Sequence, residues 1–328
     1  MKYSREYLDQ RSASTGFRPD TLEKVLRLLR LLDQVTRHPF LGSRLLLKGG
    51  TALNLFYAAA PRLSVDLDFN YVGAVDRGQM LRERPEVERA VNQVVVGEGY
   101  RVQWGHDEHA GRKLYLTYLS GLGSSDRIEL DLNYLFRVPL AEPERRPAWT
   151  PDPDFPCEAR IVSREEVMAG KLLALLDRVA ARDLYDVAAF AAAPSEYELP
   201  VLRCLFVALS GVLPRALSAY GARHLDRFTQ QSVDVELAPM LRSGETPSVG
   251  ALRERAEALL GRILALSPSE AEYVERIQWG ELAPELVVAN QPELLARLRT
   301  HPALLWKVEN ARKRPRGTIA DPGDRRPS

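Results

Sequence analysis

Residues 45–70 read LLLKGGTALNLFYAAAPRLSVDLDFN, and the interpretation of the whole chain starts from this stretch. An apolar run leads into the glycine pair of KGGT at residues 48–51, and a short apolar helix is expected over residues 51–59. Residues 64–70 then alternate strictly between polar and apolar side chains. Alternation with a period of two predicts a half-buried strand. The stretch therefore predicts a strand, a glycine turn, a helix and a second strand.

Two carboxylates lie on one face of the second expected strand. Asp66 and Asp68 are two residues apart, so their α-carbons should be about 6.5–7 Å apart. Carboxylates this close repel each other unless a cation lies between them, and Mg²⁺ binds proteins through one or two carboxylates plus substrate phosphates. Gly49 and Gly50 offer bare backbone N–H groups for an anion. The spacing alone also occurs in solvated surface pairs, and the glycine turn favours a nucleotide and metal site.

A second strand repeats the pattern. Over residues 127–135 charged or polar side chains alternate with apolar ones, so Asp131 is a candidate third metal carboxylate. The alternative is that Glu129 and Asp131 line a solvent-exposed face of the sheet.

Two cations and two acids are expected on helices further along the chain. Lys171 and Arg178 are seven residues apart, on nearly one helix face, and together they could hold a triphosphate. The alternative for Lys171 is a side chain with its stem on the core and its ammonium in water. Asp183 and Asp186, three residues apart, could orient these cations by ion pairing or belong to a surface salt-bridge face.

Composition narrows the class of protein. The 328 residues are 45% hydrophobic and 27% charged, as in ordinary globular proteins, and the net charge of +1 means that any basic surface must be local. Two distant cysteines, Cys157 and Cys204, favour free thiols in a reducing cytoplasm. We expect no signal peptide and no membrane span.

The fold class expected is α+β, with a mixed sheet flanked by helices and then a helical C-terminal domain. We expect an α/β domain over 1–138, a Pro-rich crossing segment over 139–160, a helical domain over 161–310 and a disordered basic tail over 311–328. Helices are predicted to open at capping boxes headed by Asp20 and Ser163, and at Pro85 and Ser267. Further strands are predicted over 100–104, 113–119 and 127–135.

Taken together, KGGTAL at residue 48, RLSVDLDF at residue 62, KLLAL at residue 171 with Arg178, and RDLYD at residue 182 resemble the AbiEii/MenT nucleotidyltransferase toxins. The match covers about residues 40–190, and the motifs are specific as an ordered set. One departure is Gly-Gly-Thr where the broader superfamily has Gly-Ser.

The resemblance implies a polymerase-β-like nucleotidyltransferase fold and transfer of nucleotides, pyrimidines in some members, from an NTP to the 3′ end of tRNA. It implies Mg²⁺ (or Mn²⁺) as cofactor, a cognate antitoxin as partner, and a cytoplasmic enzyme that we expect to be a monomer. Matched residue by residue, it makes Asp66 and Asp68 the metal-binding pair, Ser64 the nearby serine, Lys171 the essential lysine and Asp186, or Asp183, the later acid. The nucleotide would contact Lys48, Gly49, Gly50, Thr51, Ser64, Arg178, Arg182 and Asp183.

An RNA substrate needs basic surface, for which Arg62, Arg215, Arg223 and Arg227 are candidates. Two rival functions remain. One is a phosphatase of the HAD type, which also uses a DxD pair, but on a fully buried parallel strand. The other is a non-catalytic partner-binding protein that keeps a relic of the site.

Overall fold

The computed structural model describes residues 3–193 and 197–313. The chain divides into two compact units: unit 1 is Met1–Val167 with Gln230–Ser248, and unit 2 is Met168–Thr229 with Val249–Ser328. The sheet-containing unit therefore extends beyond residue 138, where the sequence analysis ended it. Of the tail expected from residue 311, residues 314–328 lie outside the described residues, and Arg312 still belongs to a helix.

The described part of unit 1 is built on a seven-stranded mixed sheet with the order β3-β4-β5-β2-β1-β7-β6. β2 pairs antiparallel with β1 and parallel with β5. The strands predicted from alternation are confirmed, with ends shifted by a few residues. The bounds are β1 Leu45–Lys48, β2 Asp66–Tyr71, β3 Arg101–Asp107, β4 Gly111–Leu119, β5 Ser125–Asn133, β6 Glu144–Pro147 and β7 Glu158–Ile161.

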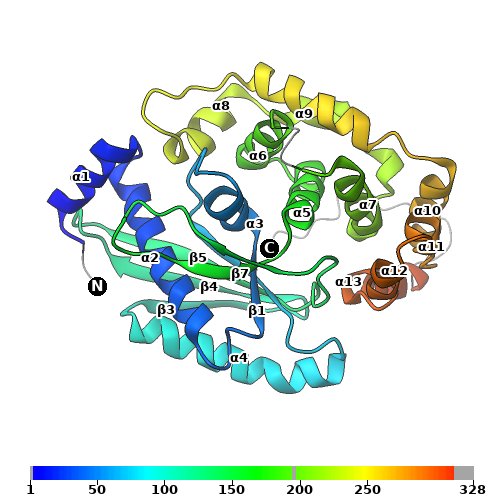
Figure 1. The fold of residues 1–328 in the computed structure, drawn as a ribbon, viewed down its shortest axis with the longest axis horizontal. Coiled ribbons are helices and arrows are strands. Elements are labelled where there is room, and N and C mark those ends of the chain that lie inside the picture. Colours follow the sequence, from blue (N-terminus) through cyan, green and yellow to red (C-terminus); the bar gives the residue numbers. More distant parts are fainter. Residues whose placement is uncertain (1–2, 194–196, 314–328) are drawn as a thin grey trace. The chain divides into compact units, whose positions relative to one another are not determined.

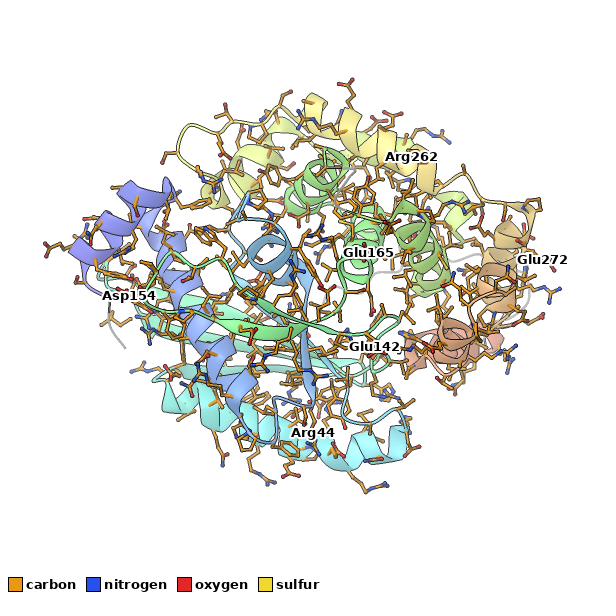
Figure 2. The ribbon with its side chains drawn as sticks, in the orientation of Figure 1. Arg44, Glu142, Asp154, Glu165, Arg262 and Glu272 are labelled. Carbon is orange, nitrogen blue, oxygen red and sulfur yellow. The ribbon has the colours of Figure 1, made fainter. Side chains whose placement is uncertain are left out.

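Two long helices cover one face of this sheet (Figure 1). α2 packs on β2, β5 and β7, and α4 packs on β3 and on α2. The side chains that the sheet turns toward this layer are apolar and buried, such as Leu114, Ile128 and Leu130. Arg44, labelled in Figure 2, ties the start of β1 to α4 by an ion pair with Glu83 at 2.9 Å. The opposite face carries the polar positions of β2 and β5.

The helical elements of unit 1 are α1 Arg5–Thr15, α2 Pro19–Arg37, α3 Gly49–Thr51, the π-helix η1 Ala52–Tyr57, α4 Arg77–Gly97, α8 Gln230–Ser232, the π-helix η6 Val233–Leu237 and the 3₁₀ turn η7 Ala238–Met240.

Two helix starts differ from the prediction. α2 begins at Pro19, so Asp20 lies inside the first turn and is not the cap. α4 begins at Arg77, where the Asp76 carboxylate accepts a hydrogen bond from Gln79 N at 2.7 Å. Pro85 lies within α4. Proline removes one backbone hydrogen bond, and the helix persists because tertiary packing of its apolar face supplies most of a helix's stability.

The proline-rich segment over residues 139–160 is not only a crossing segment. It contributes β6 and the start of β7, which pair antiparallel with each other. β6 is an edge strand and ends at Pro147. An edge strand tolerates proline because one side of its backbone needs no partner.

A late segment of the chain returns to unit 1. Residues 230–248 are fastened to the first helices and to the turn before β2 by hydrogen bonds. Thr21 Oγ1 donates to the Pro239 carbonyl at 3.0 Å, and Leu63 N donates to the Met240 carbonyl at 2.8 Å. The fold of unit 1 thus depends on residues far beyond its strands.

Unit 2 is helical in its described residues. α5 begins in the last residues of unit 1, where Ser163 Oγ accepts a hydrogen bond from Glu166 N at 3.3 Å, as its expected capping role requires. The capping box predicted at Ser267 is also present, with Glu270 as its second partner. The helices are α5 Arg164–Asp177, α6 Ala181–Ala191, α7 Leu199–Leu209, α9 Val249–Ile263, α10 Pro268–Gln278, α11 Glu285–Val288, α12 Pro292–Arg299 and α13 Pro302–Arg312, with 3₁₀ turns η3 Ser210–Val212, η4 Leu217–Ala219 and η5 Ala222–Arg227.

In the part of the chain that the structure describes, no helix combines the length and the apolar composition needed to cross a lipid bilayer.

A buried carboxylate joins α2 to the turn between β4 and β5. Glu23 is fully buried and accepts hydrogen bonds from Ser120 Oγ at 2.5 Å, Gly121 N at 3.1 Å and Arg27 Nε at 2.8 Å. The Arg27 guanidinium also lies over the Tyr118 ring, 4.1 Å from its centroid. Glu23 therefore satisfies a buried cation and two further donors at once.

We predict that Glu23→Ala lowers the free energy of unfolding by about 3–5 kcal/mol, because it leaves the Arg27 charge buried without its partner. Urea titration followed by circular dichroism measures the change. Glu158→Ala, which breaks the exposed Arg145–Glu158 pair on β6 and β7, is the control and should cost less than about 1 kcal/mol. Equal losses in the two variants would contradict the assignment.

Candidate active site

Four charged side chains occupy one row across the sheet of unit 1. Lys48 on β1 is in register with Asp68 on β2, and Asp68 is in register with Asp131 on β5. Asp131 in turn faces Lys113 on β4. Neighbouring strands are about 4.8 Å apart, so the row consists of two adjacent acids with one cation at each end, all at close spacing. The prediction that Asp131 comes beside the DxD pair is confirmed by this register.

Asp66 belongs to the next row on the same face. It is in register with Glu129. The Glu129 carboxylate also pairs with Lys113 at 3.6 Å and with Arg127 at 3.1 Å. Asp66 and Asp68 are half-buried while Leu67 between them is fully buried, as the alternation predicted.

Gly49 makes room for Asp68. Its φ of +72° lies in the left-handed region, and a Cβ there would lie 2.2 Å from Asp68 Oδ2. A side chain at position 49 therefore cannot coexist with the Asp68 carboxylate in its present position. The glycine turn and the second acid of the DxD pair therefore form one structural unit. The sequence analysis placed the two near each other but did not predict that they are in direct contact.

The rest of the glycine turn holds β2 in place. The Thr51 hydroxyl donates to the Asp66 carbonyl at 2.6 Å, and the side chain is fully buried. The Gly50 carbonyl accepts from Asn54 Nδ2 at 3.0 Å. Ser64 is buried just before β2. Of the residues expected to contact phosphate, Thr51 has its hydroxyl proton committed to the backbone, so it has no O–H left to donate to a phosphate.

The acids of the row influence each other. Burial raises the pKa of Asp131 above its ordinary value, the nearby Asp68 carboxylate raises it further, and Lys48 and Lys113 oppose both effects. Burial by itself would lower the pKa of Lys113, but Glu129 and Asp131 outweigh it and raise that pKa. The row is thus a place where a further positive charge would be stabilised.

A divalent cation fits this set of donors. Among the described residues no three His, Cys, Asp or Glu side chains gather into a metal-binding cluster. Two adjacent carboxylates with hard oxygen donors are nevertheless what Mg²⁺ uses when substrate phosphates complete its coordination. The geometry therefore fits a metal that arrives with a nucleotide better than a permanent structural metal.

A second charged cluster lies in unit 2, between α5 and α6. Lys171 Nζ is 2.9 Å from Asp183 Oδ1 and 2.8 Å from Asp186 Oδ2. All three side chains are buried, that of Lys171 with 8% of its surface exposed. The expected ion pairing is confirmed, and the alternative of a lysine with its ammonium in water is excluded.

Arg178 extends this cluster to the surface. Its Nε donates to Asp183 Oδ2 at 2.7 Å, while 59% of its side chain is exposed. Burial would raise the pKa of Asp183, but Lys171 and Arg178 outweigh it and lower that pKa. Asp183 therefore stabilises the fold at neutral pH, and this contribution is lost as the pH falls below its ordinary value of 3.8. Arg182 lies half-buried on the same helix as both acids.

Several residues of the site escaped the sequence analysis. Lys113 follows from no motif, because its position opposite Asp131 depends on strand register. Phe136 lies under the Lys48 ammonium, 5.7 Å from Nζ to the ring centroid. Asn70 is 4% exposed on the DxD face, and its Oδ1 has no hydrogen-bond partner among the described residues. The alternation of residues 64–70 places Asn70 on the same face as Asp66 and Asp68, but it does not show that Asn70 is buried.

The prediction that Arg62 lies on the surface is wrong. Arg62 was a candidate for RNA contact, but it is 1% exposed and donates from Nη1 to the Leu63 carbonyl at 2.8 Å. Its guanidinium is part of the interior of the turn that precedes β2.

The mixed sheet, the glycine turn and the neighbouring acids agree with the nucleotidyltransferase class that the motifs predicted. The model of the family described as nucleotidyl transferase AbiEii toxin, type IV TA system, matches residues 30–287. The chain belongs to this family of toxin–antitoxin nucleotidyltransferases, as its motifs predicted.

Solved structures share the fold. MenT4, a nucleotidyltransferase toxin from Mycobacterium tuberculosis H37Rv, is 18% identical with a TM-score of 0.64, over 90% of this chain and 98% of that one. JHP933 from Helicobacter pylori is 18% identical with a TM-score of 0.50, over 76% of this chain and 93% of that one. No curated protein matches the chain by sequence. At these identities the likeness concerns the fold, and it confirms the predicted mixed sheet followed by a helical region.

Both rival functions lose their basis. A HAD-type phosphatase carries its first aspartate on a fully buried parallel strand, whereas β2 pairs antiparallel with β1 as well as parallel with β5, and both of its aspartates are half-buried. A non-catalytic relic is at odds with a family of nucleotidyltransferases.

We predict that Gly49→Ala reduces the rate of nucleotide transfer by about a hundredfold. The added Cβ would displace Asp68, and if this carboxylate holds the metal as the motifs predict, a shift of about 1 Å has a cost of that order. The fold should remain, with a loss of stability of about 1–2 kcal/mol from the left-handed backbone. Gly97→Ala at the end of α4 is the control, since a Cβ there meets nothing within 4 Å. Full activity of Gly49→Ala would show that Asp68 can move without consequence.

We predict that Lys171→Met lowers the free energy of unfolding by about 3–5 kcal/mol, because two buried carboxylates lose their common cation. The triple variant Lys171→Met, Asp183→Asn, Asp186→Asn should be less destabilised, since it leaves no uncompensated buried charge. Thermal and urea unfolding of both proteins measure the difference. A triple variant that is less stable than the single one would refute this account of the cluster.

Proposed function

We propose that this toxin transfers a nucleoside monophosphate, with a pyrimidine base, from an NTP to the 3′ end of tRNA. The addition would block aminoacylation and stop growth until a cognate antitoxin neutralises the enzyme. The observation that supports this most is the row Lys48–Asp68–Asp131–Lys113, together with Gly49, whose missing Cβ leaves room for the Asp68 carboxylate. Family membership supplies the reaction class, and the acceptor and the base come from the resemblance of the motifs.

In the proposed reaction the terminal ribose hydroxyl attacks the α-phosphate. A bond forms between the hydroxyl oxygen and phosphorus, the bond to the bridging oxygen breaks, the hydroxyl proton is released, and pyrophosphate leaves. Mg²⁺ (or Mn²⁺) held by Asp66 and Asp68, with Asp131 beside them, would lower the pKa of the attacking hydroxyl and offset phosphate charge. The chain's own part is to hold these acids on one face of the sheet, close to where the phosphates would bind.

The cations have distinct tasks in this proposal. Lys48 lies beside Asp68 and Lys113 beside Asp131. The two cations reduce the repulsion between these carboxylates and an incoming polyphosphate. The Lys171 ammonium has three N–H donors, two of which point to Asp183 and Asp186. We therefore assign Lys171 chiefly to fixing α6 and its acids, and the exposed Arg178 to charge on the departing pyrophosphate.

The partners follow from the same proposal. An enzyme that uses NTP and tRNA would act in the cytoplasm, where both are made, and we propose that it works as a monomer with its antitoxin as protein partner.

Incubation with each of four α-³²P-labelled nucleotides and total tRNA tests the function. We predict that the wild type labels tRNA from a pyrimidine nucleotide and that Asp66→Ala and Asp68→Asn each lower the rate at least a hundredfold, because both remove a ligand charge from the metal site. Asp126→Asn, on the same strand as Asp131 and paired with Lys24, is the control. Undiminished transfer by either active-site variant would overturn the assignment, and labelling of proteins but not RNA would overturn the acceptor.

A further inference from the structure

A short segment of unit 2 gathers positive charge on one side. This segment is residues 215–228, between α7 and α8, and it contains the turns η4 and η5. One side of this segment is anchored in the core of unit 2 by four buried side chains: Leu217, Tyr220, Leu225 and Phe228. The other side carries arginines.

Three arginines of this segment, Arg215, Arg223 and Arg227, form what we call the arginine patch. Arg223 and Arg227 are exposed, and Arg215 lies over the Tyr220 ring, 5.0 Å from its centroid. The Tyr220 ring lies against His224, with 4.9 Å between ring centroids. Burial lowers the pKa of His224, a backbone hydrogen bond to Gly221 opposes this, and all three patch arginines lower it further. All three guanidiniums therefore act electrostatically on one imidazole.

The charge of the patch is not compensated. In residues 3–193 and 197–313 none of the three arginines forms an ion pair, whereas other arginines of unit 2 do, such as Arg276 with Glu272, the latter labelled in Figure 2. Residues 215–227 hold three arginines and one acid, Asp226, so this segment carries a local excess of positive charge in a chain of net charge +1.

Hydrogen bonds from a neighbouring helix fix the backbone of the segment. Arg253 on α9 donates from Nη2 to the Asp226 carbonyl at 2.9 Å and also to the Phe228 carbonyl. These bonds, together with the buried apolar side, fix the backbone that carries the arginines. Little conformational entropy then remains to be lost when an anion binds.

We propose that the arginine patch binds backbone phosphates of the RNA acceptor, and so holds the body of the substrate while its 3′ end reacts. This inference rests on the proposed function in one respect, that the acceptor is RNA. Guanidinium groups match phosphate oxygens in geometry and charge, and clustered unpaired arginines are the electrostatic signature of a nucleic-acid surface. Tyr220 is too buried to stack on a base, so the patch contributes affinity and not sequence choice.

The triple variant Arg215→Gln, Arg223→Gln, Arg227→Gln tests the patch. Binding of tRNA is measured by filter retention over a range of salt concentrations. Each lost phosphate contact lowers the slope of log affinity against log salt by about 0.9, so we expect a loss of about 2–3 in slope and at least a tenfold weaker affinity at low salt. In transfer assays the KM for tRNA should rise at least tenfold, with kcat and the KM for the NTP unchanged.

The matched control replaces three ion-paired arginines by glutamine: the exposed Arg145 and Arg299 and the partly exposed Arg276. It removes the same net charge and should leave the salt slope within about 0.5 of the wild type. Equal slopes for the patch variant and the wild type would overturn the proposal. A raised KM for the NTP with unchanged tRNA binding would also overturn it, and would assign the patch to the triphosphate.

Binding and transfer separate the two proposals. If the wild type binds tRNA and the patch variant does not, but neither transfers label, the patch is supported and the proposed reaction fails. If the wild type transfers label and both proteins bind tRNA alike, the reaction is supported and the patch fails.

Discussion

The contact between the Asp68 carboxylate and the bare α-carbon of Gly49 is the constraint on which the site in unit 1 depends. The carboxylate lies where a Cβ of residue 49 would be, so the turn after β1 and the side chain from β2 occupy complementary space. That complementarity exists only if β1 and β2 pair antiparallel with Lys48 opposite Asp68. A shift of one residue would turn every side chain of β2 to the other face and bury both acids in the core.

The same register explains how two neighbouring acids are tolerated. Asp68 and Asp131 come from parallel strands and lie side by side, an arrangement that repulsion alone would oppose. Lys48 and Lys113 complete the row at its two ends. The cations reduce the repulsion without neutralising the acids, so the site keeps its attraction for a divalent cation and its nucleotide. The sheet thus sets the electrostatics of the site as well as its geometry.

The sequence was informative wherever a feature is local. Alternation identified β2 and β5 and correctly assigned their acids to one face, and the ordered motifs indicated the family. Register between strands is not local, even across the 18 residues that separate Lys113 from Asp131. For that reason Lys113 was missed and Asn70 was not recognised as buried. Pro85 and the proline-rich segment misled for a related reason: proline penalises helix and sheet locally, and packing of α4 and the edge position of β6 outweigh the penalty. The return of residues 230–248 to unit 1 has no local signal at all.

Charge provides the last step of the argument. Many cations of this chain form ion pairs with acids, and the buried pairs have a different role from the exposed ones. Glu23 with Arg27, and Lys171 with Asp183 and Asp186, are buried and fix elements to each other. Removing one partner from such a group would leave a desolvated charge, so these groups resist change. Cations that are exposed and unpaired have no such structural task, and their mutual repulsion would favour their loss or dispersal unless a ligand compensates it. Arg223 and Arg227 are exposed, and among the described residues neither they nor the half-buried Arg215 forms an ion pair. This clustering of unpaired cations is the physical reason to look for RNA phosphates at the arginine patch.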